Sequence, residues 1–294
     1  YVEKIQKEHV VDFSNLELLS FIYFVDPLFA KYWQELEASG ILSMEHVDHV
    51  FSSFITGGIV KADILDMMER FGLIAKFSAS PTDKKYFVPA QLKSSPVELC
   101  NMELSSTDPC PLYLLFVHGF VPHGLFLQLV SRCIRWCSET WATHQPTLYQ
   151  NGAWFIIGKD IHDFVLICKT GFVKVTLRQR KAQSDQVEGQ NSVELATLVR
   201  EFLEDTLKNL SQEMPYLRGM KYRLCVACPY CHQGAEETRR ACSDQVKTTC
   251  THKDCFHLID ANEGRPDICK RKPCNKVAPV CGLKKWFLKR RSQV

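Results

Sequence analysis

Cysteines near the C-terminal end are the residues of this sequence whose type and spacing best suit a chemical role. Cys228 and Cys231 enclose Pro229 and Tyr230, which places two thiols on one tight turn. Two thiolates with this spacing can bind one Zn²⁺ at about 2.3 Å each, and tetrahedral coordination then requires a second pair of ligands. The pattern predicts a structural Zn²⁺ bound by four cysteines, with no open position for a reacting water.

Two further cysteine pairs are candidates for the other half of the site. Cys250 and Cys255 follow a polar stretch, whereas Cys269 and Cys274 follow an apolar segment at 256–260 that suits a strand. The later pair fits better the order of a zinc ribbon, in which a turn, a hairpin, a strand and a second turn follow one another. Both pairs remain open. Substitute or second-site ligands in the same segment are Cys225, Cys242, His252, His257 and Cys281.

Disulfides and simple burial are the alternatives to zinc. Nine of the fourteen cysteines lie in the last 70 residues, a density that also suits a disulfide-stabilised secreted domain. That local number is odd, however, and the other cysteines have mostly apolar neighbours, as reduced thiols in a core do. These are Cys100, Cys110, Cys133, Cys137 and Cys168. We therefore favour zinc in the C-terminal segment and core packing for the remaining thiols.

The composition describes a folded chain of more than one domain. Its 294 residues suffice for two or three domains of about 100 to 150 residues. Hydrophobic residues make up 46% of the chain and charged residues 23%, which are the proportions of a globular protein. The longest apolar runs, at 112–116 and 164–168, are far shorter than the roughly 20 residues of a membrane span. The chain does not begin with Met, so we expect a fragment whose targeting signals lie elsewhere.

Charge divides the chain at Pro215. From this residue onward 17 Lys and Arg stand against 7 Asp and Glu, a net charge of +10. The first 214 residues carry a net charge of −7. Together with the cysteine density, this asymmetry predicts a separate, basic, zinc-binding segment at 215–294.

Residues 1–92 are predicted to form a winged-helix-like domain. The spacing of apolar residues indicates three short helices, which begin near Pro27, Ser43 and Lys61. Two short strands joined by a turn then follow at 77–89, which is the pattern of a β-hairpin.

A Ser- and Pro-rich linker is predicted at 93–110, followed by a second domain at 111–214. Apolar runs separated by turns indicate strands at 112–117, 154–157, 163–168 and 172–177. Apolar stripes indicate a helix after Gly124 and a long helix at 192–212. The predicted fold class is thus α+β, with a winged-helix-like subdomain, a β-rich subdomain and a C-terminal zinc-ribbon-like segment.

Four strings in the first 212 residues carry a resemblance to a known family. They are VDPLF at 25–29, ASGILS at 38–43, DILDMMERFGL at 63–73 with YFVP at 86–89, and FVPHGLF at 120–126. In this order and spacing the chain resembles the COR domain of Roco proteins, the region that follows their Ras-like GTPase domain. It is most similar to the animal Roco proteins that lack a kinase. The segment between residues 19 and 25 is shorter than in that family.

The resemblance implies a non-catalytic regulatory module in two halves, COR-A at 1–92 and COR-B at 111–214. Such a module couples the nucleotide state of an upstream Roc GTPase domain to homodimerisation and to other signalling proteins, in a cytoplasmic setting and in pathways such as innate immunity. The chain contains no Gly-x-x-x-x-Gly-Lys-Ser/Thr string. Any GTPase activity is therefore expected in an upstream domain outside this chain.

Nucleic-acid binding is the alternative function, because a winged helix beside a zinc ribbon also occurs in transcription factors. A DNA-binding third helix should be basic in order to meet phosphates. Here the predicted third helix carries Lys61 and Arg70 against Asp63, Asp66 and Glu69. This charge balance argues against a nucleic-acid partner.

Two remaining features of the sequence bear on function. The tail at 284–291 (KKWFLKRR) sets aromatic residues among cations, which suits an anionic membrane or RNA. A solvated terminus with one hydrophobic anchor is the simpler interpretation of the same pattern. The histidines His118, His123 and His162 have no nucleophile with an orienting acid nearby in sequence, so we predict no catalytic residues.

Overall fold

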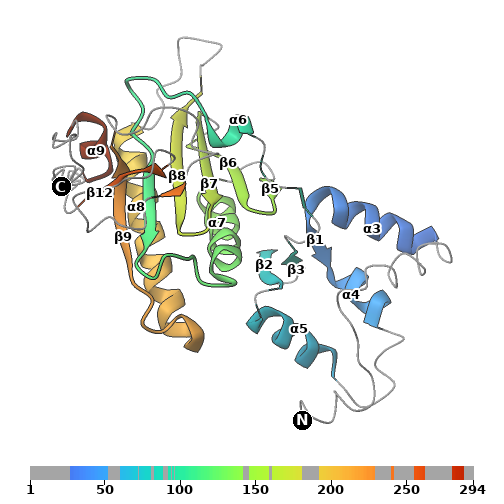
Figure 1. Ribbon diagram of the computed structural model, residues 1–294. Helices are drawn as coiled ribbons and strands as arrows, with labels where there is room; N and C mark the ends of the chain where they lie inside the picture. The colour runs from blue at the N-terminus through green and yellow to red at the C-terminus, as the bar shows by residue number, and fades with distance from the viewer. Residues whose placement is uncertain are drawn as a thin grey trace, which may run out of the picture.

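The structure is a computed structural model, and it describes residues 27–51, 60–71, 73–80, 83–88, 92–93, 95, 97–141, 146–158, 161–180, 192–228, 240–241, 255–261 and 280–287. Within these ranges the fold is mixed α+β. A small N-terminal unit lies beside a larger unit built on a seven-stranded sheet (Figure 1). No helix in the described ranges is both long enough and apolar enough to cross a membrane.

The N-terminal unit combines three helices with a small antiparallel sheet. The helices are α3 (Pro27–Ser39), α4 (Met44–Phe51) and α5 (Lys61–Arg70). The strands pair in the order β1-β3-β2 and are β1 (Ile41–Ser43), β2 (Ala75–Ser80) and β3 (Asp83–Phe87). The three predicted helices and the predicted hairpin are confirmed. The sequence does not predict β1, because three residues show no clear alternation.

A glycine sets the path of the chain from α3 into β1. Gly40 has φ 67°, and its N–H donates to the carbonyl of Leu36 at 2.7 Å. Glycine adopts this left-handed end of a helix without strain. A Cβ at Gly40 would also lie 2.7 Å from Cδ1 of Leu92. The string ASGILS therefore contains a glycine that the backbone requires.

The larger unit is built on an antiparallel sheet with the strand order β12-β9-β4-β8-β7-β6-β5. The strands are β4 (Leu112–Phe116), β5 (Thr147–Tyr149), β6 (Gly152–Ile157), β7 (His162–Cys168), β8 (Phe172–Gln179), β9 (Tyr222–Ala227) and β12 (Leu258–Asp260). The four strands predicted from apolar runs are confirmed as β4, β6, β7 and β8. Their runs are continuous because both faces of the sheet are covered at these strands.

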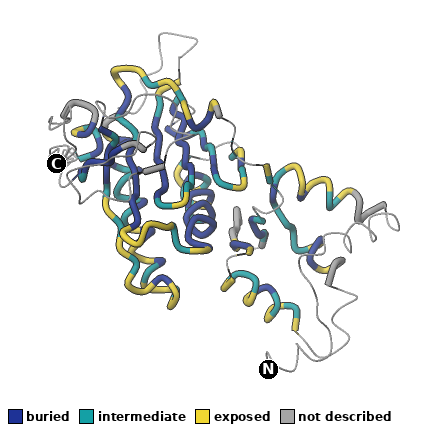
Figure 2. The backbone as a smooth tube through the Cα atoms, viewed as in Figure 1, coloured by how far each residue is buried: buried dark blue, intermediate teal, exposed yellow. Residues whose placement is uncertain are grey.

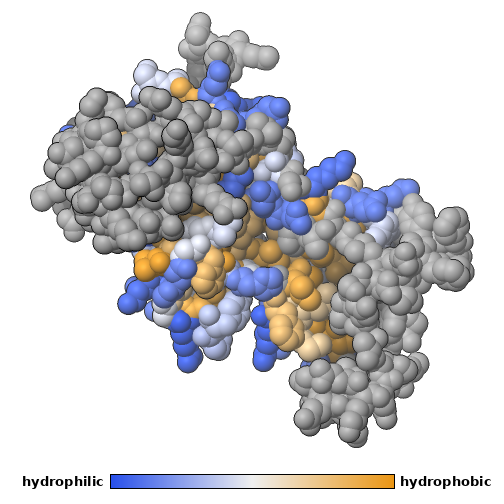
Figure 3. Space-filling model, viewed as in Figure 1, coloured by the Kyte–Doolittle hydropathy of each residue, from blue (hydrophilic) through white to orange (hydrophobic). Residues whose placement is uncertain are grey.

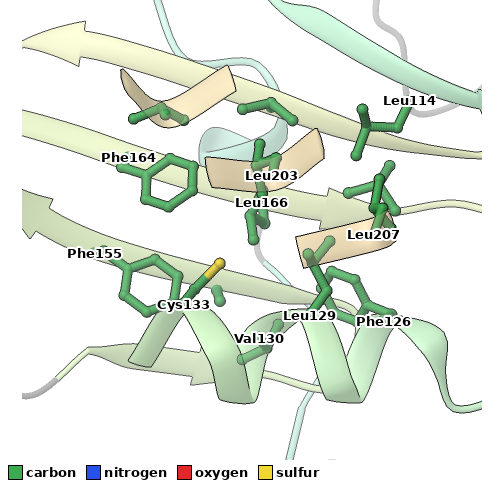
Figure 4. Packing of buried hydrophobic residues seen from close by; sticks show 14 of the residues in the cluster. Leu114, Phe126, Leu129, Val130, Cys133, Phe155, Phe164, Leu166, Leu203 and Leu207 are labelled. Carbon is green, nitrogen blue, oxygen red and sulfur yellow. The ribbon is translucent and has the colours of Figure 1, made fainter. Parts of the chain in front are cut away.

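Two helices cover one face of this sheet. They are α7 (Leu125–Trp141) and α8 (Ser192–Glu213), which confirm the two predicted amphipathic helices. Figure 4 shows Leu129 and Cys133 of α7 and Leu203 of α8 converging on strand residues such as Phe164. Each buried Leu or Phe of this kind stabilises the fold by roughly 1.5–3 kcal/mol.

The opposite face is covered by the segment predicted to be a linker. Its short helix α6 (Val97–Cys100) buries Leu99 and Cys100 against Val165 and Ile167 of β7. The buried Lys174 donates from Nζ to the carbonyl of Cys100 at 2.8 Å. Part of the predicted linker at 93–110 thus packs against the sheet.

The C-terminal segment does not begin a separate body at residue 215. After the 3₁₀ turn η3 (Pro215–Leu217), β9 and β12 join the large sheet, and α9 (Val280–Phe287) packs on α8. A short parallel pair is formed by β10 (Arg240–Ala241) and β11 (Cys255–Phe256). The change in charge at Pro215 therefore does not coincide with an edge of the sheet, because charge describes the surface of a segment and not the strands with which it pairs.

Helix α7 joins the two units. Ala75 of β2 and Phe87 of β3 are fully buried in the same hydrophobic core as the apolar residues of α7. Ser131 of α7 donates from Oγ to the carbonyl of Lys76 at 2.6 Å. Figure 2 accordingly shows α7 buried along most of its length.

Apolar side chains also reach the surface around the end of α5 (Figure 3). The exposed fractions of Met67, Phe71 and Leu73 are 38%, 63% and 45%. The smaller core of the N-terminal unit lies behind them and consists of Val47, Leu65, Ile74 and Tyr86.

Candidate functional site

The candidate site starts at the end of β9. This strand alternates side chains between the two faces of the sheet and pairs with β4 on one side and β12 on the other. Cys228 follows β9 directly and is fully buried, and its N–H donates to the carbonyl of His257 at 2.9 Å. The first cysteine of the predicted zinc turn is therefore placed in the interior, opposite a second candidate ligand, His257, which directly precedes β12.

Cys228 belongs to the face of the sheet that α9 covers. It lies in one cluster with Val226 of β9, Ile259 of β12 and Leu283 of α9. His257 is the residue before β12 and is only 8% exposed. A metal held here would be shielded from water on several sides, which is typical of a structural zinc site.

Cys225 has a different environment and a different role. Its thiol lies on the other face of the sheet and donates to Oδ1 of Asp260 at 3.3 Å. Burial, together with the charge of Asp260, raises the pKa of the Cys225 thiol well above its ordinary value. Arg223 contacts the same carboxylate at 2.8 Å. Cys225 thus donates a hydrogen bond on the face opposite to Cys228, so the two thiols do not face the same side of the sheet.

The predicted zinc ligands are distributed as follows. Cys228 has a described side chain, and the backbone of Cys255 is described in β11. The other four predicted ligands lie outside the described residues: Cys231, Cys250, Cys269 and Cys274. No cluster of three or more His, Cys, Asp or Glu side chains suited to a metal occurs within the described part of the chain.

The five cysteines that precede the C-terminal segment, Cys100, Cys110, Cys133, Cys137 and Cys168, are buried or partly buried and form no disulfide. Burial raises the pKa of Cys137 to about 12 and, despite the nearby cation of Lys169, that of Cys168 to about 12. Thiols that stay protonated are poor nucleophiles. The prediction that these cysteines fill the core agrees with their burial.

Residues 284–287 of the basic tail belong to α9, and residues 288–291 lie outside the described residues. Trp286 is fully buried in the main core, and its indole Nε1 donates to the carbonyl of Cys110 at 2.7 Å. Lys285 donates from Nζ to three consecutive carbonyls, those of Ser106, Thr107 and Asp108, at 3.0, 2.8 and 3.1 Å. Lys285 and Trp286 of the predicted membrane-binding motif thus have partners within the fold.

Arg200 of α8 holds α9 from the other side. Its Nε donates to the carbonyl of Trp286 at 2.8 Å, and its guanidinium lies 4.9 Å from the ring centroid of Phe287. The same guanidinium pairs with Glu201 at 3.3 Å and with Glu204. The sequence offers no direct signal for this contact, because Arg200 on its own has the pattern of a solvated helix residue.

The histidines considered for catalysis occupy separate places. His118 and His123 are exposed in the connection between β4 and α7. His162 is buried at the start of β7, where burial lowers its pKa although the carboxylates of Asp108 and Asp163 act in the opposite direction. The Asp163 carboxylate accepts hydrogen bonds from the guanidinium of Arg178, at 2.5 and 3.0 Å, and from the indole N–H of Trp154.

No protein-family model matches the chain, and no curated protein matches it significantly. The resemblance to the COR domain therefore rests on the four sequence strings and on the order of the elements.

Proposed function

We propose that this chain is the COR region of a Roco-type GTP-binding protein, a non-catalytic module for dimerisation and signal relay. It would couple an upstream Ras-like GTPase domain to other signalling proteins in the cytoplasm. The observation that carries the proposal is the core that α7 shares with both units. A relay needs such a rigid connection, because a change at one unit must move the other.

The N-terminal unit supports a winged-helix-like COR-A half. Its elements follow the order helix, strand, helix, helix, strand, strand, from α3 to β3. The first strand, β1, pairs with β3 at the side away from β2, so that a three-stranded sheet closes against the helices. This arrangement fits a winged helix, in which the last two strands form the hairpin.

The shared core supports the coupling role. Phe87 of β3 and Ala75 of β2 pack into the core of the large sheet, whereas Leu65 packs in the separate core of the N-terminal unit. The same hairpin therefore contacts α7 on one side and the helices of its own unit on the other. A displacement of these helices would be transmitted to α7 and to the sheet.

The charges of α5 support a protein partner and not a nucleic acid. Lys61 pairs with Asp48 of α4, and Arg70 pairs with Asp66 at 2.9 Å within α5. Both cations of the third helix thus have carboxylate partners in the fold. Binding a phosphate backbone would require these pairs to break and would still leave three acidic side chains near the phosphates.

A structural Zn²⁺ is part of the proposal. Cys228 is buried at the end of a strand, beside a buried histidine. The seven described cysteines without disulfides include Cys133 and Cys137, which are four residues apart on one helix. Reduced thiols so close together fit a reducing compartment, which supports both zinc and a cytoplasmic location.

Light scattering tests the relay. The full chain joined to its upstream GTPase domain is measured in the GDP form and with a non-hydrolysable GTP analogue. We expect the molar mass to shift between monomer and dimer with the nucleotide. The same monomeric mass in both forms, over a wide concentration range, would refute the proposed function.

A further inference from the structure

Three connections meet at one end of the large sheet. They join β4 to α7 at 117–124, β7 to β8 at 169–171, and α8 to β9 at 214–221. Strand β4 lies between β8 and β9, and its last residue, Phe116, is opposite the first residue of β9, Tyr222. Figure 1 shows the connection from β4 to α7 at this end of the sheet.

Backbone hydrogen bonds hold the three connections together. The N–H of Val117 donates to the carbonyl of Lys221 at 3.0 Å, on the side of β9. The N–H of Val121 donates to the carbonyl of Thr170 at 2.7 Å, on the side of β8. The connections therefore form one continuous surface, with the connection between β4 and α7 in its middle.

The middle connection exposes two apolar side chains. The exposed fractions of Val117 and Phe120 are 52% and 55%. All four residues from 117 to 120 are exposed, and Figure 2 shows this connection largely in yellow. A Cβ at Gly119 would have no heavy atom within 4 Å beyond its chain neighbours, so the turn opens into solvent. Apolar side chains grouped at such a tip mark an interaction surface.

Cations lie on both sides of this apolar tip. Lys169 is partly exposed on one side, and Arg218 and Lys221 are exposed on the other. Within the described part of the chain, none of these three side chains has an ion-pair partner. The three connections contain no Asp or Glu. The adjacent Glu213, at the end of α8, pairs with Arg132 of α7 at 2.5 Å. The tip is thus surrounded by positive charge.

An apolar tip between cations fits a bilayer that contains anionic lipids. Each Lys or Arg close to such a surface strengthens binding about fivefold. Apolar side chains can enter the boundary between the headgroups and the acyl chains. A peptide ligand, by contrast, is bound in a groove or along a sheet edge. The tip stands out from the surface, where a fluid layer of headgroups can surround it.

We propose that this end of the large sheet docks onto an anionic membrane surface. Val117 and Phe120 enter the interfacial layer, while Lys169, Arg218 and Lys221 meet the negative charges of the headgroups. The inference goes beyond the proposed relay and does not depend on it. It places the module on a membrane through the folded sheet and not through the basic tail.

The basic tail lies at the opposite end of β4. Lys285 and Trp286 of α9 donate to carbonyls of residues 106–110, which precede β4, whereas Val117 follows it. Lys284 of α9 is exposed as well. Neutralising Lys284 therefore changes the charge of the chain by the same amount as neutralising a cation of the proposed surface, but at a different place.

Vesicle sedimentation of the full chain tests the proposal. Vesicles of phosphatidylcholine alone are compared with vesicles that also contain phosphatidylserine, at low and at high salt. We expect binding to the anionic vesicles only, and we expect salt to weaken it because exposed charges are screened. Phe120→Ser should weaken binding about tenfold, and Arg218→Gln and Lys221→Gln about fivefold each. Lys284→Gln should bind like the unmodified chain. Circular dichroism checks that each variant is folded.

Three results would overturn the proposal. The absence of binding to anionic vesicles at low salt would remove the membrane as a partner. Weaker binding of Lys284→Gln, with unchanged binding of Phe120→Ser and Lys221→Gln, would assign the contact to the basic tail. Loss of a dimer in Phe120→Ser, measured by light scattering without vesicles, would make this surface an interface between copies of the chain. The relay is tested by molar mass without vesicles, so either proposal can fail while the other stands.

Discussion

At the scale of single residues, Trp286 connects parts of the chain that are far apart in sequence. Its ring is buried in the main core, its indole binds the carbonyl of Cys110, and its own carbonyl accepts from Arg200. Replacing a buried Trp with Ala costs about 3–5 kcal/mol. We expect Trp286→Ala to lower the free energy of unfolding by this amount, measured by urea denaturation followed by circular dichroism.

The neighbouring Lys284 provides the control for this variant. Its side chain is exposed in the same helix, α9. Lys284→Ala should change the free energy of unfolding by less than about 0.5 kcal/mol, as is usual for exposed positions. Equal effects of the two variants would show that Trp286 is not an anchor in solution.

His162 makes stability depend on pH. Burial lowers its pKa in the folded state, so the unfolded chain binds a proton more readily than the folded one. The stabilisation is complete above the unfolded pKa of about 6.5 and is lost progressively as the pH falls below it. We expect the urea midpoint to decrease between pH 7.5 and 5.5, and we expect His162→Gln to make this decrease smaller. Identical pH profiles for the two chains would contradict the assignment.

The role of a residue was easier to predict from its type and spacing than the neighbours with which it forms contacts. The spacing of Cys228 and Cys231 predicts a metal-binding turn, and the packing of the five earlier cysteines in or against the core follows from their apolar neighbours. The partners of Lys285 and Arg200 could not be predicted, because their hydrogen bonds go to backbone carbonyls. Every residue offers a carbonyl, so the sequence carries no specific signal for such a contact.

At the scale of elements, long periodic segments were predictable and short edge elements were not. The apolar stripes of α7 and α8 and the continuous runs of β7 and β8 each carry enough residues to define a period. By contrast, the three-residue strands β1 and β5 were not predicted, and the strand predicted at 256–260 gave no indication that β12 pairs with β9. The choice between the two candidate pairs that would complete the zinc site stays a prediction, because three of their four cysteines lie outside the described residues.

Hydrogen exchange separates the elements held by the sheet from those that would be held by the metal. Strand β7 is paired on both sides and buried on both faces, so its amides should exchange only by global unfolding. Strand β12 is a short edge strand next to the proposed zinc. After removal of zinc with a chelator, we expect peptides that cover β12 to exchange faster and peptides that cover β7 to stay unchanged, as measured by mass spectrometry.

Two results would contradict this expectation. Unchanged exchange of β12 would show that no metal stabilises it. Equally faster exchange of β7 would show that the metal holds the entire sheet together, which would make the zinc site part of the main folding unit.

At the scale of the whole molecule, the difference in charge and the shared sheet describe different properties. The basic segment after Pro215 has a charge of its own, yet β9 lies between β4 and β12 in the sheet. The sheet therefore connects the residues before and after Pro215. Through α7, the same core also includes residues of the β2–β3 hairpin of the N-terminal unit. We expect the two units to unfold in one cooperative transition, because α7 has contacts with both of them.

Phe87 and Leu65 provide a matched test of this cooperativity. Phe87 packs in the shared core and Leu65 in the core of the N-terminal unit alone. Alanine substitutions at such sites cost about 3–5 and 2–5 kcal/mol respectively, so both variants lose comparable stability. We expect Leu65→Ala to lower the unfolding midpoint of both units together, whereas Phe87→Ala separates the two midpoints. Pulse-labelled hydrogen exchange in urea reports on the two units in one sample.

The same pair of variants links stability to the relay. If the shared core transmits the nucleotide state, Phe87→Ala should abolish the difference in molar mass between the GDP and GTP-analogue forms, and Leu65→Ala should preserve it at a temperature where both variants are folded. Two separate midpoints in the unmodified chain would contradict the rigid connection through α7. A nucleotide response that survives in Phe87→Ala would show that the signal reaches the large sheet by a route other than the hairpin.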